Sequence, residues 1–363
     1  MRYKLKEIFE LQMGKTPSRH NSSYWNTGDY KWISIADLSN VGKYISETKE
    51  TISESAVIES GIKIIPANTV VMSFKLSIGK TAITAEDMYS NEAIMAFHDK
   101  KIVELLPEYI YYLFKFKDWN VGSNKAVMGK TLNKATLAEM EIEIHTIEEQ
   151  KEIIKVLDQI SNIIANRKQE LIQLDNLIQA RFVEMFGDPI MNPKGWNVVT
   201  IKDIVTEVRY GTSKPAVEGG KYPYLRMNNL TLNGQLDLKN LKYIDIPDEE
   251  IEKCVVRKGD VLFNRTNSID LVGKTAVFNL VEDMVIAGYI IRIRLNEKLL
   301  PEVFSQYMNL KALKDVLRAM AKGAVNQANI NAQELQSIKV YLPDMDIQKQ
   351  FIKIKDQIDK SKF

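Results

Sequence analysis

The sequence is short of the residues that form metal clusters and covalent cross-links. Its 363 residues include one cysteine, Cys254, and three histidines, His20, His98 and His145, which lie far apart in the chain. One cysteine excludes an internal disulfide and a cysteine-based metal cluster, and the scattered histidines argue against a histidine site. We therefore expect no bound metal.

Long apolar runs and a strong excess of one charge are missing as well. No hydrophobic segment approaches the length of a membrane span, and the N-terminus lacks a signal-peptide core. Together with the single cysteine, this predicts a cytoplasmic protein. The formal net charge is only +2, so affinity for nucleic acid would have to come from locally clustered Lys and Arg.

What the chain does contain is 45% hydrophobic residues, enough for two ordinary cores, and a stretch without Gly or Pro over residues 146–186. Apolar residues recur there at alternating spacings of four and three, the period of a coiled-coil seam. At ~1.5 Å per residue, such a helix is on the order of 60 Å long. It could pack on one core or act as a spacer between two bodies. The seam residues expected to contact a partner helix or chain are Ile153, Leu157, Ile160, Ile164, Leu171, Leu174 and Ile178.

The residues before this helix predict an α+β unit. A helix is expected to begin at Pro107, because proline is tolerated in a first helical turn. Alternation of apolar and polar residues, or short apolar runs bounded by turns, predicts strands at 30–38, 62–65, 69–74, 81–84 and 140–145.

The chain then repeats itself. Five segments recur in the same order, at offsets that drift from 192 to 198 residues: Tyr30–Leu38 at 222–230, Gly79–Ala82 at 273–276, Leu105–Glu108 at 299–302, Leu132–Asn133 at 330–331, and Leu157–Ile160 at 355–358. Ordered matches with slow drift indicate a duplicated domain with small loop insertions. The predicted organisation is a domain over 1–145, a helix over 146–186, a second domain over 187–345 and the start of a second helix over 346–363.

The two Gly-Lys-Thr segments superficially suggest a phosphate-binding loop. That motif needs a glycine five residues before the Gly-Lys pair, and Phe74 and Ser268 stand there instead. We therefore interpret Lys80 and Lys274 as loop cations. No set of residues in the sequence marks a catalytic site.

The order of motifs resembles the specificity subunit of Type I restriction-modification systems. The residues that carry this resemblance are Gly14-Lys15-Thr16-Pro17, Tyr30–Leu38, Gly79-Lys80-Thr81, Glu149-Gln150-Lys151, Phe186-Gly187-Asp188-Pro189 and Asn192-Pro193-Lys194-Gly195-Trp196. The resemblance implies an α+β protein with two target-recognition domains, joined by long helices that form an antiparallel coiled coil.

The same resemblance implies a non-catalytic subunit. Such a subunit binds a bipartite, asymmetric sequence in double-stranded DNA and directs two modification (methyltransferase) subunits, with two restriction (nuclease-translocase) subunits as an optional addition. The assembled complex would be an adenine-specific DNA methyltransferase and an ATP-dependent endonuclease. S-adenosylmethionine, ATP and Mg would bind the partner subunits, and no cofactor is expected on this chain. The alternative is a structural adaptor that binds proteins without reading DNA.

Reading DNA requires phosphate anchors and side chains with paired donors and acceptors for base edges. Arg suits guanine, and Gln or Asn suits adenine, so we favour Arg226, Arg265 and Gln327 for base contacts and lysines for phosphate. For any one of these residues, a merely solvated polar loop is an equally good interpretation. The aromatic residues Trp32, Tyr222 and Tyr224 are expected in the core. The candidate DNA-binding residues are Lys15, Ser18, Arg19, Asn21, Lys75, Lys80, Lys125 and Lys130 in the first domain, and Lys214, Arg226, Asn228, Arg265, Asn267, Lys274, Asn326, Gln327 and Asn329 in the second.

The second helix, as present in this sequence, is about half as long as the first. In an antiparallel pairing its apolar residues would cover only residues 167–185 of the first helix. We therefore expect an exposed apolar stripe on the uncovered half, formed by Ile153, Leu157, Ile160 and Ile164, which another chain would cover.

Overall fold

The computed structural model describes residues 1–75, 77–119, 132–324 and 327–362, and the chain separates into two compact units, Met1–Ala165 (unit 1) and Asn166–Phe363 (unit 2). The division falls within the continuous helix α6 (Ile147–Phe186), so each unit contains about half of it. α6 begins after Thr146, whose backbone N–H donates to the Glu149 carboxylate at 2.8 Å. The long helix predicted over 146–186 is confirmed.

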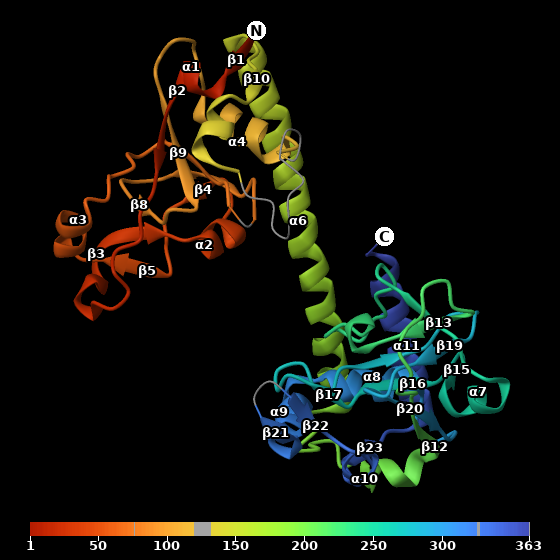
Figure 1. Cartoon of the computed structure of the whole chain (residues 1–363). Coiled ribbons are helices and arrows are strands. Elements are labelled where there is room, and N and C mark those ends of the chain that lie inside the picture. Colours follow the sequence, from red (N-terminus) through yellow and green to blue (C-terminus); the bar gives the residue numbers. More distant parts are fainter. Residues whose placement is uncertain (76, 120–131, 325–326, 363) are drawn as a thin grey trace. The chain divides into compact units, whose positions relative to one another are not determined.

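Unit 1 is α+β (Figure 1), with a five-stranded sheet in the order β2-β9-β6-β7-β4 and a three-stranded sheet in the order β5-β3-β8. A short antiparallel ribbon joins β1 to β10. Its strands are β1 (Arg2–Lys4), β2 (Phe9–Met13), β3 (Trp25–Ile33), β4 (Tyr44–Ile45), β5 (Glu50–Ile52), β6 (Val70–Ser73), β7 (Thr81–Thr84), β8 (Tyr89–Ser90), β9 (Ile94–Asp99) and β10 (Glu141–Glu143). Its helices, besides α6, are α1 (Leu5–Ile8), η1 (Ser22–Tyr24), α2 (Ile35–Asn40), α3 (Glu54–Ser60), α4 (Pro107–Phe116) and α5 (Lys134–Ala138).

Unit 2 contains two four-stranded sheets, in the orders β12-β20-β16-β18 and β14-β13-β19-β15, a three-stranded sheet β17-β22-β21 and a ribbon β11-β23. Its strands are β11 (Asn197–Thr200), β12 (Val205–Tyr210), β13 (Tyr222–Leu225), β14 (Lys242–Ile244), β15 (Val255–Val256), β16 (Val261–Asn264), β17 (Thr266–Asn267), β18 (Thr275–Val277), β19 (Met284–Ile286), β20 (Ile290–Leu295), β21 (Lys322–Ala324), β22 (Gln327–Asn329) and β23 (Lys339–Leu342). Its helices are η2 (Ile201–Ile204), η3 (Met227–Asn229), α7 (Asp248–Cys254), α8 (Pro301–Asn309), α9 (Lys311–Met320), α10 (Ala332–Ser337) and α11 (Met345–Lys360).

The sheets of the two units have the same strand order. The order β12-β20-β16-β18 of unit 2 repeats β2-β9-β6-β7 of unit 1, and β14-β13-β19 repeats β5-β3-β8. The ribbon β11-β23 repeats β1-β10, with the same antiparallel pairing. The duplication that the sequence matches predicted is therefore present in the topology.

A buried glutamine marks the start of the long helix in both units. In unit 1, the Gln150 side chain accepts from the Leu106 N–H at 3.0 Å and donates to the carbonyls of Glu104 and His145. In unit 2, Gln348 makes the same three hydrogen bonds, accepting from the Leu300 N–H at 2.9 Å and donating to the carbonyls of Lys298 and Pro343. Both side chains are fully buried. Each glutamine thus ties the first turn of its helix to the loop before α4 or α8.

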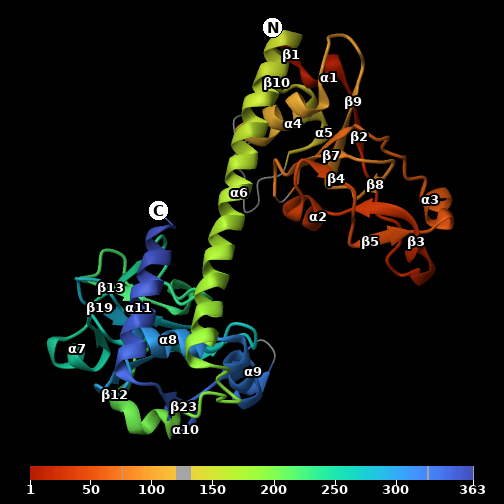
Figure 2. The ribbon, with the colours of Figure 1, turned by 180° about the vertical axis from the view of Figure 1, so that it is seen from behind.

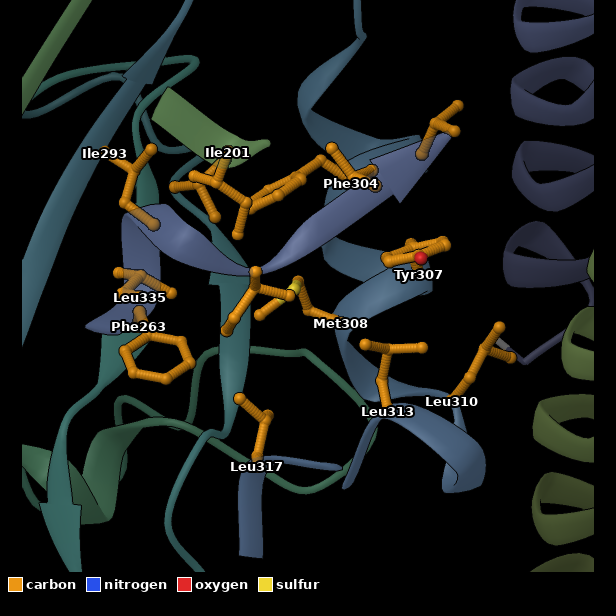
Figure 3. Close-up of a cluster of buried hydrophobic side chains, with 14 of the residues drawn as sticks. Ile201, Phe263, Ile293, Phe304, Tyr307, Met308, Leu310, Leu313, Leu317 and Leu335 are labelled. Atoms are coloured by element: carbon orange, nitrogen blue, oxygen red, sulfur yellow. The ribbon is translucent and has the colours of Figure 1, made fainter. Parts of the chain in front are cut away.

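Each half of α6 belongs to the core of its own unit. In unit 1, Ile153, Ile154 and Leu157 pack against a core that includes the rings of Phe97 and Phe114. In unit 2, the buried Ile178, Phe182 and Phe186 join a core built largely on α8, α9 and strands β16 and β20 (Figure 3). The figure labels Phe263 from β16, Ile293 from β20, and Phe304, Tyr307 and Met308 from α8.

Within unit 2, α11 runs antiparallel to the second half of α6 (Figure 2). Phe351 near the start of α11 contacts Phe182 and Phe186, whereas Ser361 after its end accepts a hydrogen bond from Arg167. The predicted antiparallel pairing of the two helices is therefore confirmed.

The expected apolar stripe is only partly present. Ile160 and Ile164 are exposed, whereas Ile153 and Leu157 are half-buried against the core of unit 1. Leu171 and Leu174 are half-buried and Ile178 is buried. The prediction failed for the first two residues because the start of α6 packs on the domain that precedes it.

Two predicted strands differ from the structure. The strand expected over 30–38 ends at Ile33, because Ser34 and Asp37 form a capping box that starts α2. The segment 62–65 is not a strand, although Ile65 forms an isolated bridge with Met88. The strands predicted at 69–74, 81–84 and 140–145 correspond to β6, β7 and β10, and α4 begins at Pro107 as expected.

Candidate nucleic-acid interface

The repeated Gly-Lys-Thr segments form equivalent turns between two strands. In unit 1, the Gly79 N–H donates to the Ser73 carbonyl at 2.9 Å, and in unit 2 the Gly273 N–H donates to the Asn264 carbonyl at 2.8 Å. Both glycines have positive φ, 90° and 82°, a backbone conformation that other residues rarely adopt. The motif is therefore a structural turn, consistent with our rejection of a phosphate-binding loop.

The two lysines of these turns lie in different environments. Lys80 is exposed, as expected of a loop cation. Lys274 is buried, and its Nζ donates to the Met227 carbonyl at 2.7 Å. Burial lowers the pKa of Lys274. The interpretation of Lys274 as a loop cation was wrong, because the side chain turns inward to satisfy a carbonyl of the neighbouring loop.

Four predicted DNA-binding residues of unit 2 come together on the small sheet β17-β22-β21. Arg265 precedes β17, Asn267 lies in it, and Gln327 and Asn329 lie in β22. The Ile330 N–H donates to the Arg265 carbonyl at 2.9 Å, which fixes β22 beside the arginine. Gln327 is exposed, whereas Asn329 accepts a hydrogen bond from Thr266 and Asn267 donates to Asn264. The sheet therefore presents Gln327 outward and uses the two asparagines to hold its own shape.

Arg265 lies over the ring of Tyr210, with its guanidinium carbon 4.9 Å from the ring centroid. One Nη donates to the Gly288 carbonyl at 3.5 Å, a long contact, and the buried Nε has no hydrogen-bond partner within the described part of the chain. A guanidinium with unused donors beside an aromatic ring can donate hydrogen bonds to a new acceptor, such as a base edge.

Arg226 lies between β13 and η3, and its Nη2 donates to the Asn240 carbonyl at 3.0 Å. Its Nε is also buried without a hydrogen-bond partner among the described residues. Asn228 next to it is exposed. Lys214 forms an ion pair with Glu250 at 2.9 Å. Of these three candidates, Arg226 and Asn228 have polar atoms without a partner among the described residues. Lys214 would have to break its ion pair with Glu250 before it could contact DNA.

In unit 1, the loop over residues 14–21 folds onto a pair of tryptophans. The Arg19 guanidinium stacks 3.6 Å above the Trp25 ring and forms two hydrogen bonds with the Glu50 carboxylate, at 2.5 and 3.0 Å. The hydrogen bonds to Glu50 outweigh desolvation and raise the pKa of Arg19, and the same pairing lowers the pKa of Glu50. Trp25 and Trp32 donate to the carbonyls of Ser18 and Lys15, both at 3.1 Å. The loop is thus held in one conformation, with half of the Arg19 side chain still exposed.

The other unit 1 candidates are placed as follows. Lys15 is exposed and its ammonium donates to the Ser60 carbonyl, and Asn21 caps η1. Lys75 is half-buried, 5.3 Å from the centroid of the Phe74 ring. Lys125 and Lys130, like Asn326 of unit 2, lie outside the described residues. Of the three aromatic residues expected in the core, Trp32 and Tyr224 are buried and Tyr222 is only half-buried.

The sequence analysis missed three residues on or near the small sheet β17-β22-β21. Tyr210 and Tyr289 are large exposed aromatic side chains, and Lys322 on β21 is mostly exposed, with an ion pair to Glu334. The sequence did contain a signal for Tyr210: the residue that follows it, Gly211, is at the position in unit 2 that Gly14 occupies in unit 1. The N–H groups of these glycines donate to the carbonyls of Ile290 and Ile94, and an added Cβ would lie 2.2 Å from a carbonyl oxygen at both positions.

The two units present different side chains at equivalent positions. The Leu132 N–H donates to the Phe74 carbonyl in unit 1, as the Ile330 N–H donates to that of Arg265 in unit 2. Phe74 is buried, so unit 1 has no arginine where unit 2 has Arg265. Two surfaces of shared topology and different chemistry would recognise different ligands.

The surface described above carries no sign of a metal centre or a membrane anchor within the described residues. No group of three or more His, Cys, Asp and Glu side chains there could hold a metal ion. None of the helices described is long and apolar enough to cross a membrane.

Known proteins are similar to this chain in sequence. The chain is 32% identical over 250 residues to the Type I restriction enzyme MjaIX specificity subunit of Methanocaldococcus jannaschii, an alignment that covers 62% of this chain and 57% of that protein. It is 22% identical over 263 residues to the EcoKI specificity subunit of Escherichia coli, covering 68% of this chain and 56% of that protein. The chain thus spans a little over half the length of these relatives.

Two solved structures share the fold. The S subunit of the Type-I restriction-modification system of M. genitalium matches with a TM-score of 0.51 and 14% identity, over all of this chain and 90% of that one. A chain from a structural study of complex assembly and conformational transition in the type I R-M system matches with a TM-score of 0.58 and 17% identity, with the same coverage. The family model for the Type I restriction modification DNA specificity domain matches residues 1–176 and again residues 193–363. The chain therefore belongs to the Type I restriction modification DNA specificity domain family and carries this domain twice.

Proposed function

We propose that this chain is the DNA-recognition subunit of a Type I restriction-modification complex. Each unit would read one half of a bipartite, asymmetric sequence in double-stranded DNA. The observation that carries the proposal is the duplicated domain with different side chains at equivalent positions, Phe74 in unit 1 and Arg265 in unit 2. Two copies of one scaffold with different surfaces suit a target made of two different halves.

In this proposal, Arg265 and Gln327 contact base edges, and Tyr210 holds the guanidinium plane of Arg265 in position. Exposed lysines such as Lys80 and Lys322 would anchor phosphates, which set the register of the protein on the duplex without selecting sequence. Since Lys274 is buried, we leave it out of the proposed interface.

The chain would act without chemistry of its own and direct two modification subunits, with two restriction subunits as an optional addition. S-adenosylmethionine, ATP and Mg would bind those partners. Support for this division comes from the family assignment and from the relatives, which are named specificity subunits of restriction enzymes.

The experiment that tests the proposal is co-expression with a modification subunit, followed by mapping of methylated adenines in plasmid DNA. We expect methylation at one bipartite sequence. Methylation that is absent or random with respect to sequence would favour the adaptor alternative.

Substitutions then assign the half-sites. Arg265→Ala should relax the requirement for one base, or cost about 1–3 kcal/mol of binding at that base, while the other half of the sequence stays unchanged. Lys349→Ala is the matched control, because it removes an exposed cation of the same unit from α11 rather than from the sheet β17-β22-β21. Equal effects of the two substitutions on methylation would contradict the assignment of Arg265.

A further inference from the structure

Arg19 of unit 1 lies at the corner of a turn whose backbone is fixed. The Asn21 N–H donates to the Ser18 carbonyl at 3.3 Å, which closes the turn and puts Arg19 at one of its two central positions. The Trp25 indole N–H donates to the same carbonyl at 3.1 Å. The Arg19 side chain is nevertheless 49% exposed. The backbone is therefore held in place while the guanidinium remains accessible to a ligand.

The guanidinium of Arg19 has hydrogen-bond donors left over. Glu50 takes two of them, since Nη1 donates to Oε1 at 2.5 Å and Nη2 donates to Oε2 at 3.0 Å. A guanidinium carries five N–H groups in one plane. The other three have no hydrogen-bond partner within the described part of the chain. Because the carboxylate contacts both Nη atoms, one side edge is left with two parallel donors, Nε–H and one Nη–H.

Two tryptophan rings fix the plane of this guanidinium. Its central carbon is 3.6 Å from the centroid of the Trp25 ring and 5.0 Å from that of the Trp32 ring. The two rings meet edge to face, with centroids 5.0 Å apart. A planar pair of donors that is already oriented loses little freedom when it binds two acceptors in the same plane.

The strands that carry these residues are repeated in unit 2, which allows a comparison position by position. Trp32 on β3 pairs with Glu50 on β5, and Tyr224 on β13 pairs with Lys242 on β14. Each of the two aromatic residues also pairs, in parallel, with the strand on its other side, β8 in unit 1 and β19 in unit 2. Glu50 and Lys242 therefore occupy equivalent positions.

The loop that contains Arg19 starts in the same way in both units. The Trp32 indole N–H donates to the Lys15 carbonyl at 3.1 Å, and the Tyr224 hydroxyl donates to the Thr212 carbonyl at 3.2 Å. The N–H groups of Lys15 and Thr212 donate in turn to the carbonyls of the equivalent strands β8 and β19. The two loops thus leave their sheets at equivalent residues.

Unit 2 has neither member of the Arg19–Glu50 pair. Four residues after the equivalent carbonyls, Ala216 stands in place of Arg19, and Lys242 stands in place of Glu50. The shared scaffold therefore forms without this pair. A pair that the scaffold does not require, present in one of two readers of the same fold, is what selection of a ligand specific to that reader would need.

The charge around Arg19 favours a neutral acceptor over a phosphate. Hydrogen bonds to Glu50 outweigh desolvation and raise the pKa of Arg19, with a smaller contribution from the negative charge of Glu92. A phosphate brought to Arg19 would be repelled by both carboxylates. Guanine instead presents two neutral acceptors, O6 and N7, on its major-groove edge, and a bidentate arginine is their commonest partner.

We propose that Arg19 reads a guanine in the half-sequence recognised by unit 1, through its Nε–H and Nη–H edge. Glu50 and Trp25 are positioning residues, which hold the guanidinium in the plane of the base. The inference rests on the proposed function of this chain. Unit 2, with Ala216 at that position, would have to select its bases with other side chains.

A modified base tests this contact without altering the protein. 7-Deazaguanine has C–H in place of the N7 acceptor, so it removes one of the two hydrogen bonds. The assay measures adenine methylation of short DNA duplexes by the purified complex of this chain with a modification subunit, once the target is mapped and the half read by unit 1 is assigned. We expect one guanine of that half at which 7-deazaguanine lowers kcat/KM about ten-fold. A half without guanine on either strand, or without a sensitive guanine, would overturn the proposal.

Substitution of Arg19 assigns the effect to this side chain. Arg19→Ala should methylate the guanine and 7-deazaguanine duplexes at similar rates, because the group that detects N7 is gone. Lys4→Ala is the matched control, since Lys4 is also a partly exposed cation of unit 1 paired with a carboxylate, that of Glu139, and it should retain the ten-fold ratio. An Arg19→Ala complex that retained the native ratio would overturn the assignment.

The positioning role of Glu50 has the same readout. Glu50→Ala leaves Arg19 present but unbraced, so the ratio between guanine and 7-deazaguanine should fall, whereas loss of overall stability alone would lower both rates equally. An unchanged ratio would exclude the positioning role. Sequence-specific methylation that is indifferent to the analogue and to Arg19→Ala would refute this inference alone. Methylation without sequence preference would refute the proposed function and this inference with it.

Discussion

Replacing Gln348 with alanine should destabilise unit 2 and leave unit 1 unchanged. The substitution removes three hydrogen bonds of a fully buried side chain and leaves one N–H and two carbonyls without their partner. At about 1 kcal/mol for each hydrogen bond lost, the free energy of unfolding of unit 2 should fall by about 3 kcal/mol. For a unit of this size, that corresponds to a fall in Tm of roughly 6–12 °C.

Hydrogen exchange read by mass spectrometry can measure this loss in each unit separately. Since 1.4 kcal/mol is a factor of ten, the slowest amides of β16 and β20 should exchange roughly 100-fold faster in the variant. Gln150→Ala should produce the reciprocal result in unit 1. Gln350→Ala is the control, because Gln350 is exposed on the same helix as Gln348. If Gln348→Ala accelerated exchange no more than Gln350→Ala, or equally in both units, the Gln348 hydrogen bonds would not have the stabilising role assigned to them.

Three further predictions concern recognition and stability. Replacing residues 187–345 with the domain of a relative that has the same residues as this chain at 178, 182 and 186 should change one half of the methylated sequence only; a change in both halves would refute the two-reader proposal. Four residues inserted between Ile164 and Leu171 add ~6 Å of helix, so the gap between the half-sequences should lengthen by about two base pairs of ~3.4 Å or methylation should be lost, and an unchanged gap would contradict the helix as a spacer. Glu207→Gln should destabilise unit 2 by about 3 kcal/mol, because it leaves the buried Arg292 without its carboxylate. Burial alone would raise the pKa of Glu207, but its arginine partners lower it overall, so the stability it contributes is present above its ordinary pKa of about 4.3 and is lost as the pH falls through the lowered value. Urea unfolding of the native protein and of the Gln variant between pH 7 and pH 3 would measure this, and an equal pH dependence in both proteins would exclude Glu207 as the cause.

The sequence predicted best those features that depend on local pattern. The period of 3.5 located α6 to within a residue, and the ordered repeats revealed the duplication, because both signals are summed over many positions. The strand expected over 30–38 was too long, because alternation continues past Ser34 although the capping box already starts a helix. Pattern alone cannot weigh one side-chain hydrogen bond against a run of apolar residues.

The candidate site was predicted less completely, because it depends on which way individual side chains turn. Lys80 and Lys274 occupy the same position in the two Gly-Lys-Thr segments, yet Lys80 is exposed and Lys274 is buried, with its Nζ donating to the Met227 carbonyl. Arg265 and Gln327 are 327 − 265 = 62 residues apart in the sequence, and the pairing of β17 with β22 that brings them together is a tertiary contact. Tyr289 gave no sequence signal at all, since nothing in its surroundings distinguishes it from a core tyrosine.

The burial of Ile178, Phe182 and Phe186 has a consequence for how such chains can be recombined. If two chains were joined at the end of α6, the core of the incoming domain would have to accommodate three apolar side chains from the other parent. A crossover upstream of Ile178 carries these side chains along with the domain they stabilise. The segment that can be inherited as a module therefore begins inside the helix, and libraries of hybrid chains joined there should yield more folded protein than libraries joined at Gly187.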